Sequence, residues 1–358
     1  MKKRNKQIGL IVAVVALLVS VMPNVQADDK HYEGWVRSFA EAKELAAKEG
    51  KSILMEFTGS DWCPPCKALH INVLGTETFK AEITKDFILL VLDDPHDKSL
   101  VSDAEQEQYK KLSEQYKVTS VPTVFLADAE GKPYHKQGGY RVDPAVKVAQ
   151  QSLGKAQETL KAAGEDEEKK KVAQEAIDKA TAELATKREA SADKWVANAS
   201  GKVKVLAQRD EFFAQASEAK GVERAKLLES AISGIDEAMR LSYYADTVTE
   251  IVSLDTDDAA GLKSKYEELQ QVEQIKAKLT AIRRGKQPQE VIAAIDELIK
   301  TAKPTGAALQ EAIFLKSNAL FSSGDKDGAK ALLLEAQKLA PNTATGKRIP
   351  QIIEQFFK

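Results

Sequence analysis

The sequence predicts an α/β domain followed by an all-helical domain, and three observations lead to this prediction. Short apolar runs rich in strand-forming residues alternate with amphipathic helical patterns up to about residue 152. Beyond Ala149 the strand formers thin out, and Ala, Leu, Lys and Glu dominate. The only two cysteines of the 358-residue chain, Cys63 and Cys66, directly follow a strand-like run. This length is sufficient for two domains, each with its own core.

Residues 1–27 have the three parts of a secretion signal. A basic start at residues 2–6, an apolar run at residues 8–22 and the small-residue site Val25-Gln26-Ala27 follow one another. The apolar run is short for a membrane span, so we expect cleavage after Ala27 and a periplasmic or secreted mature protein. An uncleaved membrane anchor remains the alternative.

The α/β domain is predicted over residues 28–152. An amphipathic helix within residues 32–51, closed by Gly50, leads into an element order β-α-β-α-β-β-α. Buried strands are predicted at residues 52–58, 87–92 and 121–126, helices at residues 63–73 and 106–116, and a last strand ending near residues 138–140. We predict a solvated turn at residues 93–96, with a metal site as the alternative.

The segment Trp62-Cys63-Pro64-Pro65-Cys66 places two thiols one helical turn apart at the start of a predicted helix. Unpaired backbone N–H groups and the helix dipole stabilise a thiolate there, so Cys63 is predicted to be the exposed nucleophile with a lowered pKa. Cys66 lies one turn deeper and is placed to resolve a mixed disulfide. Pro64 and Pro65 suit the first helical turn and stiffen the loop.

These residues resemble the active site of the thioredoxin superfamily. The strings FTGSDWCPPCKAL and VTSVPTVFLADAEGKPYHKQGGY are most similar to exported bacterial thioredoxin-like proteins with a GSDWC signature, and the resemblance covers roughly residues 31–150. It implies a thioredoxin-like domain with a central mixed sheet flanked by helices. It also implies a cis-proline at Pro122, about 60 residues downstream, that faces the dithiol.

The resemblance further implies a thiol-disulfide oxidoreductase that acts on protein or peptide disulfides. The redox-active Cys63–Cys66 pair would serve without a separate cofactor or metal. The substrate groove would be shaped by Trp62, Pro64, Pro65, Val121 and Pro122.

Glu56 lies in the strand before the dithiol and resembles the buried acid that assists proton transfer in thioredoxins. A buried carboxyl has a raised pKa and can act as a base near neutral pH, so Glu56 is the third predicted catalytic residue. The alternative is that Glu56 faces solvent or pairs with a lysine. His70, four residues after Cys66, either tunes a thiol or packs as an ordinary side chain.

Two other uses of the cysteines remain open. A zinc site needs four ligands, and the chain supplies two cysteines and four histidines without finger spacing. A structural disulfide is the second alternative, although a bridge that closes so short a loop removes little chain entropy.

The C-terminal part is predicted to be entirely helical. Residues 153–200 form a charged helical hairpin or linker, whose second helix has an apolar seam at Val172, Ala176, Ala180 and Leu184. Residues 201–358 form a domain of stacked helices. Residues 318–341 resemble a tetratricopeptide helix pair, but three similar segments starting at Gly221, Gly285 and Gly324 are irregularly spaced.

The combined prediction is an exported reductase of protein disulfides, kept reduced by a membrane thiol-electron donor. The Pro-Pro loop has no histidine to stabilise the thiolate and resembles the loops of reducing proteins of the cytochrome-maturation type. A disulfide oxidase or isomerase, and a helical-repeat scaffold with a redox-sensing dithiol, are the alternatives. The formal net charge of −2 disfavours nucleic-acid binding, and the helical domain could join protomers into a homo-oligomer.

Overall fold

The computed structural model describes residues 32–357, so the predicted signal at residues 1–27 lies outside the described residues. The described chain forms two compact units. The first comprises residues 32–132 and 136–203, and the second comprises residues 133–135 and 204–357. No helix between residues 32 and 357 combines the length and the apolar character that a membrane span requires.

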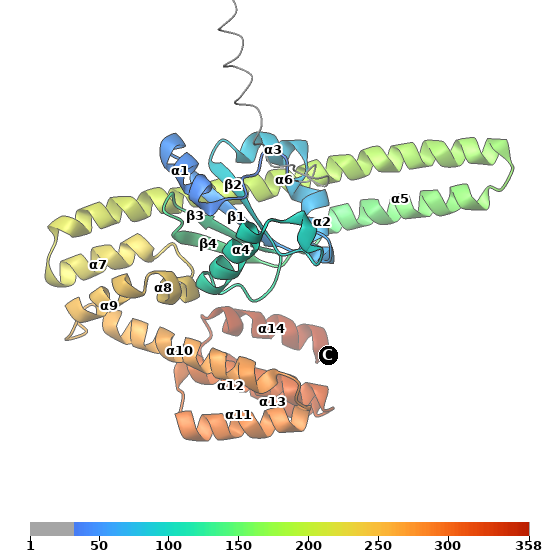
Figure 1. The fold of residues 1–358 in the computed structure, drawn as a ribbon. Helices are drawn as coiled ribbons and strands as arrows, with labels where there is room; N and C mark the ends of the chain where they lie inside the picture. Colours follow the sequence, from blue (N-terminus) through green and yellow to red (C-terminus); the bar gives the residue numbers. More distant parts are fainter. Residues whose placement is uncertain (1–31, 358) are drawn as a thin grey trace, which may run out of the picture. The chain divides into compact units, whose positions relative to one another are not determined.

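A four-stranded mixed sheet forms the centre of the α/β region (Figure 1), with the strand order β2-β1-β3-β4. Strand β1 pairs in parallel with β2 and antiparallel with β3. Every residue of β1 is buried, because the strand has a neighbour on each side and helices on both faces. The strands are β1 (Ser52–Thr58), β2 (Phe87–Asp93), β3 (Thr123–Ala127) and β4 (Pro133–Gly138).

The first helix of this region begins and ends at residue types that are common at helix ends. The Ser38 hydroxyl accepts the Glu41 N–H at the start of the first helix, and Gly50 ends it with a φ of 65°. The observed order confirms the predicted α/β fold. The helical elements are α1 (Phe39–Glu49), α2 (Pro64–Leu69), the π-helix η2 (His70–Leu74), α3 (Glu77–Ile83), the short η3 (Lys98–Leu100), α4 (Asp103–Gln115) and α5 (Pro144–Ala162).

Helix α5 and the long helix α6 (Glu167–Glu218) are joined by a turn at Gly164, which has a φ of 59°. The first part of α6 packs on the start of α5, where Leu184 joins a core cluster with Val146 and Ala149. The predicted seam of this helix is wrong at Val172 and Ala176, which are both exposed, whereas Ala173 is buried. The buried positions follow a heptad spacing that starts at Ala173. Val172 lies one position earlier and therefore points toward solvent.

The second unit is built from successive helices that pack on their neighbours. One core cluster joins α10, α11 and α12, and another joins α12, α13 and α14. This arrangement confirms the all-helical prediction, and the tetratricopeptide resemblance of residues 318–341 stays a prediction. The helices are α7 (Gly221–Ile232), α8 (Glu237–Tyr243), α9 (Ala245–Leu254), α10 (Leu262–Arg283), α11 (Pro288–Ala302), α12 (Gly306–Ser322), α13 (Lys326–Leu339) and α14 (Ala344–Phe356).

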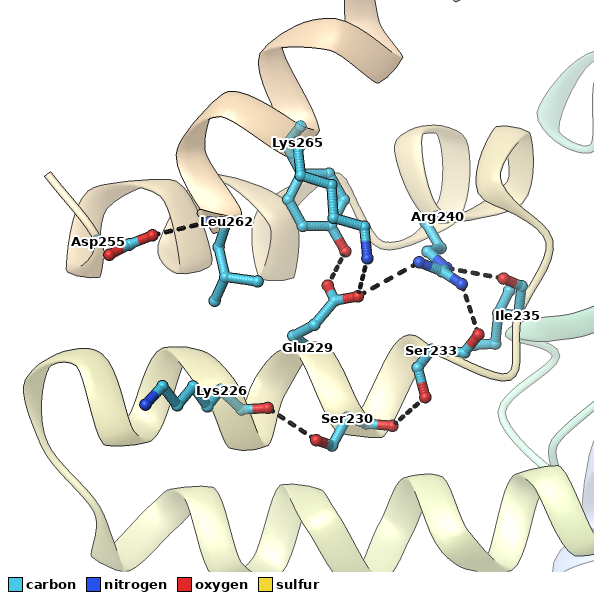
Figure 2. A network of polar contacts seen from close by, with 10 residues as sticks. Lys226, Glu229, Ser230, Ser233, Ile235, Arg240, Asp255, Leu262 and Lys265 are labelled. Atoms are coloured by element: carbon cyan, nitrogen blue, oxygen red, sulfur yellow. Dashed lines mark hydrogen bonds and ion pairs between the residues drawn. The ribbon is translucent and has the colours of Figure 1, made fainter. Parts of the chain in front are cut away.

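A nearly buried carboxylate ties three of these helices together (Figure 2). Glu229 of α7 binds Lys265 Nζ at 2.5 Å and Arg240 Nη1 at 3.4 Å, and it accepts the hydroxyl of Tyr266. Arg240 also donates to the backbone oxygens of Ile235 and Ser233. The side chains of Glu229 and Arg240 are 12% and 9% exposed, so each charge depends on the other for compensation.

Replacing Glu229 by Gln should destabilise the helical unit by about 3 kcal/mol, because the buried guanidinium of Arg240 loses its counter-charge. Chemical denaturation followed by far-ultraviolet circular dichroism measures this loss. The matched control is Glu273→Gln, which breaks a surface pair with Lys276 and should cost less than about 0.5 kcal/mol. Equal effects of the two variants would show that the Glu229 network contributes no more than a surface pair.

Candidate active site

Cys63 and Cys66 form a disulfide at the start of α2, with their Cα atoms 5.3 Å apart. Cys63 is the N-cap residue, and its Sγ accepts the backbone N–H of Cys66 at 3.2 Å. Pro64 and Pro65 occupy the first two helical positions and have no N–H. The Cys66 N–H is therefore the first backbone donor that the helix offers to the sulfur of Cys63.

The expectation that Cys63 is exposed is wrong for the disulfide form, since Cys63 and Cys66 are each only 2% exposed. The carbonyl oxygen of Val121 lies 3.7 Å from Cys63 Sγ and covers it on one side. Pro64 and Pro65, by contrast, are exposed. The two sulfurs of the disulfide are therefore largely covered, while the prolines between them face solvent.

The Val121–Pro122 peptide bond is cis. Its position follows from the sheet, because β3 begins at Thr123 opposite Phe57 of β1, close to the end of the strand that leads to the dithiol. The Pro122 oxygen accepts the N–H of Gly139 at 2.8 Å, which holds the segment from the other side. Pro122 is buried and Val121 is half-buried. The structure thus brings the predicted proline segment next to the cysteines.

The loop between β1 and α2 is fastened to the end of β2. Ser60 donates to the carboxylate of Asp93 from its N–H at 2.9 Å and from its hydroxyl at 2.6 Å. The carboxylate of Asp61 accepts the backbone N–H groups of His96 and Asp97, each at 2.9 Å. These bonds cross between two segments that each follow a strand. They fix the loop that carries Cys63.

Trp62 completes this attachment. Its indole Nε1 donates to the Asp94 oxygen at 2.8 Å, and its ring stacks on His96 with 5.0 Å between the centroids. A Cβ on Gly59 would lie 2.4 Å from the indole, so a residue without a side chain is needed there. Trp62 remains 40% exposed, and its place in a substrate groove stays a prediction.

Residues 93–96 do more than form the solvated turn that the sequence predicts, since Asp93 is 9% exposed and anchors Ser60. Burial raises the pKa of Asp93, and the hydrogen bonds from Ser60 counteract this rise. An isolated Asp-Asp pair after a strand gives no sequence signal for such a role. Within residues 32–357 no group of three or more His, Cys, Asp or Glu side chains is arranged to hold a metal ion.

Glu56 is completely buried in the middle of β1, so the solvent-facing alternative is wrong. Neither carboxyl oxygen has a hydrogen-bond donor in good geometry. The pKa of Glu56 is raised to about 8, first by burial and then by the charge of Asp93, while the hydroxyls of Tyr32 and Thr58 oppose the rise. Glu56 therefore has the proton affinity of a base that works slightly above neutral pH.

His70 lies in η2 and is 6% exposed. Its ring packs against Tyr32 with 4.8 Å between the centroids. Tyr32 itself precedes α1 in a segment without any motif, and sequence reasoning missed its position near Glu56. His70 thus belongs to the packed layer under the active-site helix.

A hollow of about 690 Å³ lies beside the segment that follows β4. Gly139, which is bonded to Pro122, lies on its wall, and Arg141 also lines it. The opposite wall is formed by α6, including Trp195 and Lys194, whose Nζ binds Asp143 at 3.1 Å. No motif in the sequence indicates that the long helix would line a hollow together with the segment after β4.

The mixed sheet, the cysteine pair at a helix start, the facing cis-proline and the acid in the central strand together define a thioredoxin-like domain. The sequence agrees, because residues 39–153 match the family model of the thioredoxin-like domain.

The chain is similar to one named protein and to two solved structures. Disulfide bond reductase DsbH of Chlamydia pneumoniae is 34% identical over 101 residues, a match that covers 28% of this chain and 60% of the relative. A solved structure named DsbH Oxidoreductase is 28% identical, with a TM-score of 0.28, and the match covers 36% of this chain and 90% of that one. A thioredoxin-fold protein from Helicobacter pylori is 22% identical, with a TM-score of 0.23, and the match covers 43% and 98%.

Replacing Glu56 by Gln should make the protein more stable than the wild type at and above pH 8. The pKa of Glu56 is raised in the folded state from an ordinary value of 4.5 to about 8. The stability that the protonated carboxyl contributes is therefore complete below pH 4.5 and is lost as the pH rises through 8. Because Gln stays neutral, the stability of the wild type relative to the variant should fall by about 5 kcal/mol across this range.

Denaturant titrations of both proteins at a series of pH values measure this difference. A difference that does not change with pH would mean that Glu56 keeps an ordinary pKa in the folded protein.

Proposed function

We propose that the protein is an exported thiol-disulfide oxidoreductase that reduces disulfides in extracytoplasmic proteins. The observation that carries the proposal is the Cys63–Cys66 pair at the start of α2, facing the cis-proline Pro122. The name of the Chlamydia pneumoniae relative, Disulfide bond reductase, supports the direction. Export rests on the signal pattern of residues 1–27.

The reaction consists of two exchange steps. The Cys63 thiolate attacks one sulfur of the substrate disulfide, forms a mixed disulfide and releases the other substrate sulfur as a thiolate. The Cys66 thiolate then attacks the Cys63 sulfur, closes the disulfide and releases the second substrate thiolate. The protein dithiol loses two electrons, and the substrate disulfide gains them. A membrane thiol-electron donor would return the pair to the dithiol.

The two prolines favour the reducing direction. At the start of a helix, backbone N–H groups stabilise a thiolate, and the two prolines lack two of these groups. Within the Cys63–Cys66 loop, the Cys66 N–H is then the donor that remains for the Cys63 sulfur. A less stabilised thiolate makes the reduced form less favourable, which lowers the reduction potential. The same loop therefore yields a stronger reductant than a loop with N–H donors at both middle positions.

Glu56 is the proposed proton acceptor for Cys66. Cys66 is 2% exposed, so its thiol proton is best exchanged with an internal group. An acid with a pKa of about 8 is well matched to a thiol, whose ordinary pKa is about 8.5. The extended substrate segment would contact Trp62, Pro64, Pro65, Val121 and Pro122. The helical unit would bind substrates or join protomers and takes no part in the chemistry.

A Cys66→Ala variant should accumulate mixed disulfides with several exported proteins, because Cys63 attacks but nothing resolves the product. Non-reducing gels and mass spectrometry of the captured species provide the measurement. The double variant Cys63→Ala/Cys66→Ala is the control and should capture none. Absence of mixed disulfides on the single variant would favour a scaffold protein with a redox-sensing dithiol over an enzyme.

The wild-type potential, measured against glutathione, should lie closer to the value of about −270 mV for thioredoxin than to about −120 mV for a strong oxidant. Pro65→His should raise it by roughly 30 mV or more, a tenfold change in the equilibrium constant, because an N–H and an imidazole then stabilise the thiolate.

The matched control for this substitution is Pro65→Ala, which restores only the N–H and should give a smaller rise. A wild-type potential near the oxidising end would favour the oxidase or isomerase alternative instead.

A further inference from the structure

We propose that Asp93 is a positioning residue for the catalytic proton: its carboxylate, anchored to the dithiol loop by Ser60, holds the proton on Glu56 when Cys66 becomes a thiolate. This inference rests on the proposed function, since it concerns the same site. It assigns a specific role to a side chain that lies outside the dithiol and outside the predicted site.

The strand register brings the two carboxyls together. In the parallel pair of β1 and β2, Glu56 lies opposite Val91, and Thr58 lies opposite Asp93. Side chains two positions apart point to the same face of a sheet, so Glu56 and Asp93 are diagonal neighbours on one face. Because this part of the sheet is covered, neither carboxyl is shielded from the other by bulk water.

Asp93 lies between the buried carboxyl of Glu56 and the dithiol loop. Glu56 is 0% exposed, whereas Asp93 is 9% exposed and accepts two hydrogen bonds from Ser60, three positions before Cys63. These charge-assisted bonds favour the ionised form of Asp93. Burial works against this ionised form, and the Ser60 bonds and Arg37 counteract burial. When Asp93 is ionised, its charge favours the neutral, protonated form of Glu56.

The other titratable groups around the pair leave this coupling in place. Tyr32 faces Glu56, and burial raises the pKa of its hydroxyl far enough to keep it neutral. Around Asp93, Arg37 favours the ionised form and Asp61 opposes it. Tyr109 of α4 also stays neutral, because burial and the nearby carboxylates raise its pKa. Asp93 is thus the strongest charge acting on Glu56.

The proton is conserved in the resolving step. The Cys66 thiol gives its proton to the Glu56 carboxylate, so that one S–H bond breaks and one O–H bond forms. The resulting thiolate attacks the mixed disulfide at Cys63 and displaces the substrate thiolate, which takes a proton from solvent. The charge of Asp93 makes Glu56 a stronger acceptor than burial alone would.

The test compares Asp93→Asn with Ser60→Ala in the full-length mature protein. The first variant removes the charge and keeps one side-chain oxygen for the Ser60 N–H. The second removes only the Ser60 hydroxyl bond and leaves the carboxylate with the Ser60 N–H and Arg37, which favour its ionised form. The primary readout is the infrared C=O band of the protonated Glu56 carboxyl, identified by its loss in Glu56→Gln and followed as a function of pH. This readout does not depend on exchange activity.

We expect Asp93→Asn to move the midpoint of the Glu56 band to lower pH and Ser60→Ala to leave it near the wild-type value. The pH profile for reduction of a disulfide-bonded model protein should move in the same direction in Asp93→Asn only. Equal midpoints in wild type and Asp93→Asn, or equal shifts in both variants, would overturn the proposal. A shifted band in a protein that reduces no disulfide would leave the carboxyl coupling intact and refute the proposed function.

Discussion

The parallel pairing of β1 with β2 constrains the position of every group in the site. It aligns the ends of the two strands, so that the segment after Thr58 and the segment after Asp93 emerge side by side. The dithiol loop is then attached to the second segment through Ser60, Asp61 and Trp62. A shift of one residue in this register would place Glu56 and Asp93 on opposite faces of the sheet and separate Asp93 from the loop.

The same sheet supplies the second support of the disulfide. Antiparallel pairing with β3 places Pro122 at the end of β1 that leads to Cys63, and the Val121 oxygen closes over the sulfur. The disulfide is therefore held between two loops, each of which is fixed by its own strand. Under the proposed function, such a site would need little rearrangement for disulfide exchange, which is the advantage of a preorganised centre.

The sequence was sufficient for the parts of the site that depend on local chemistry. The Cys-Pro-Pro-Cys segment, the apolar strand before it and the proline of β3 each have a pattern with a physical meaning. Burial of Glu56 could be predicted because its strand is apolar on both faces. Asp93, Tyr32 and the wall formed by Trp195 could not, because their roles depend on contacts between residues far apart in the chain.

Burial of two carboxyl groups in one region of the core lowers the stability of the folded protein. A buried Glu56 without a hydrogen-bond donor lowers stability at neutral pH, and a charged Asp93 nearby increases this cost. Anchoring of the loop does not require that charge, because an amide at position 93 would accept the Ser60 N–H with its oxygen and donate to the Ser60 hydroxyl with its nitrogen. This loss of stability arises where β1 leads into the dithiol loop. At that place a carboxyl group with a raised pKa is useful for proton transfer.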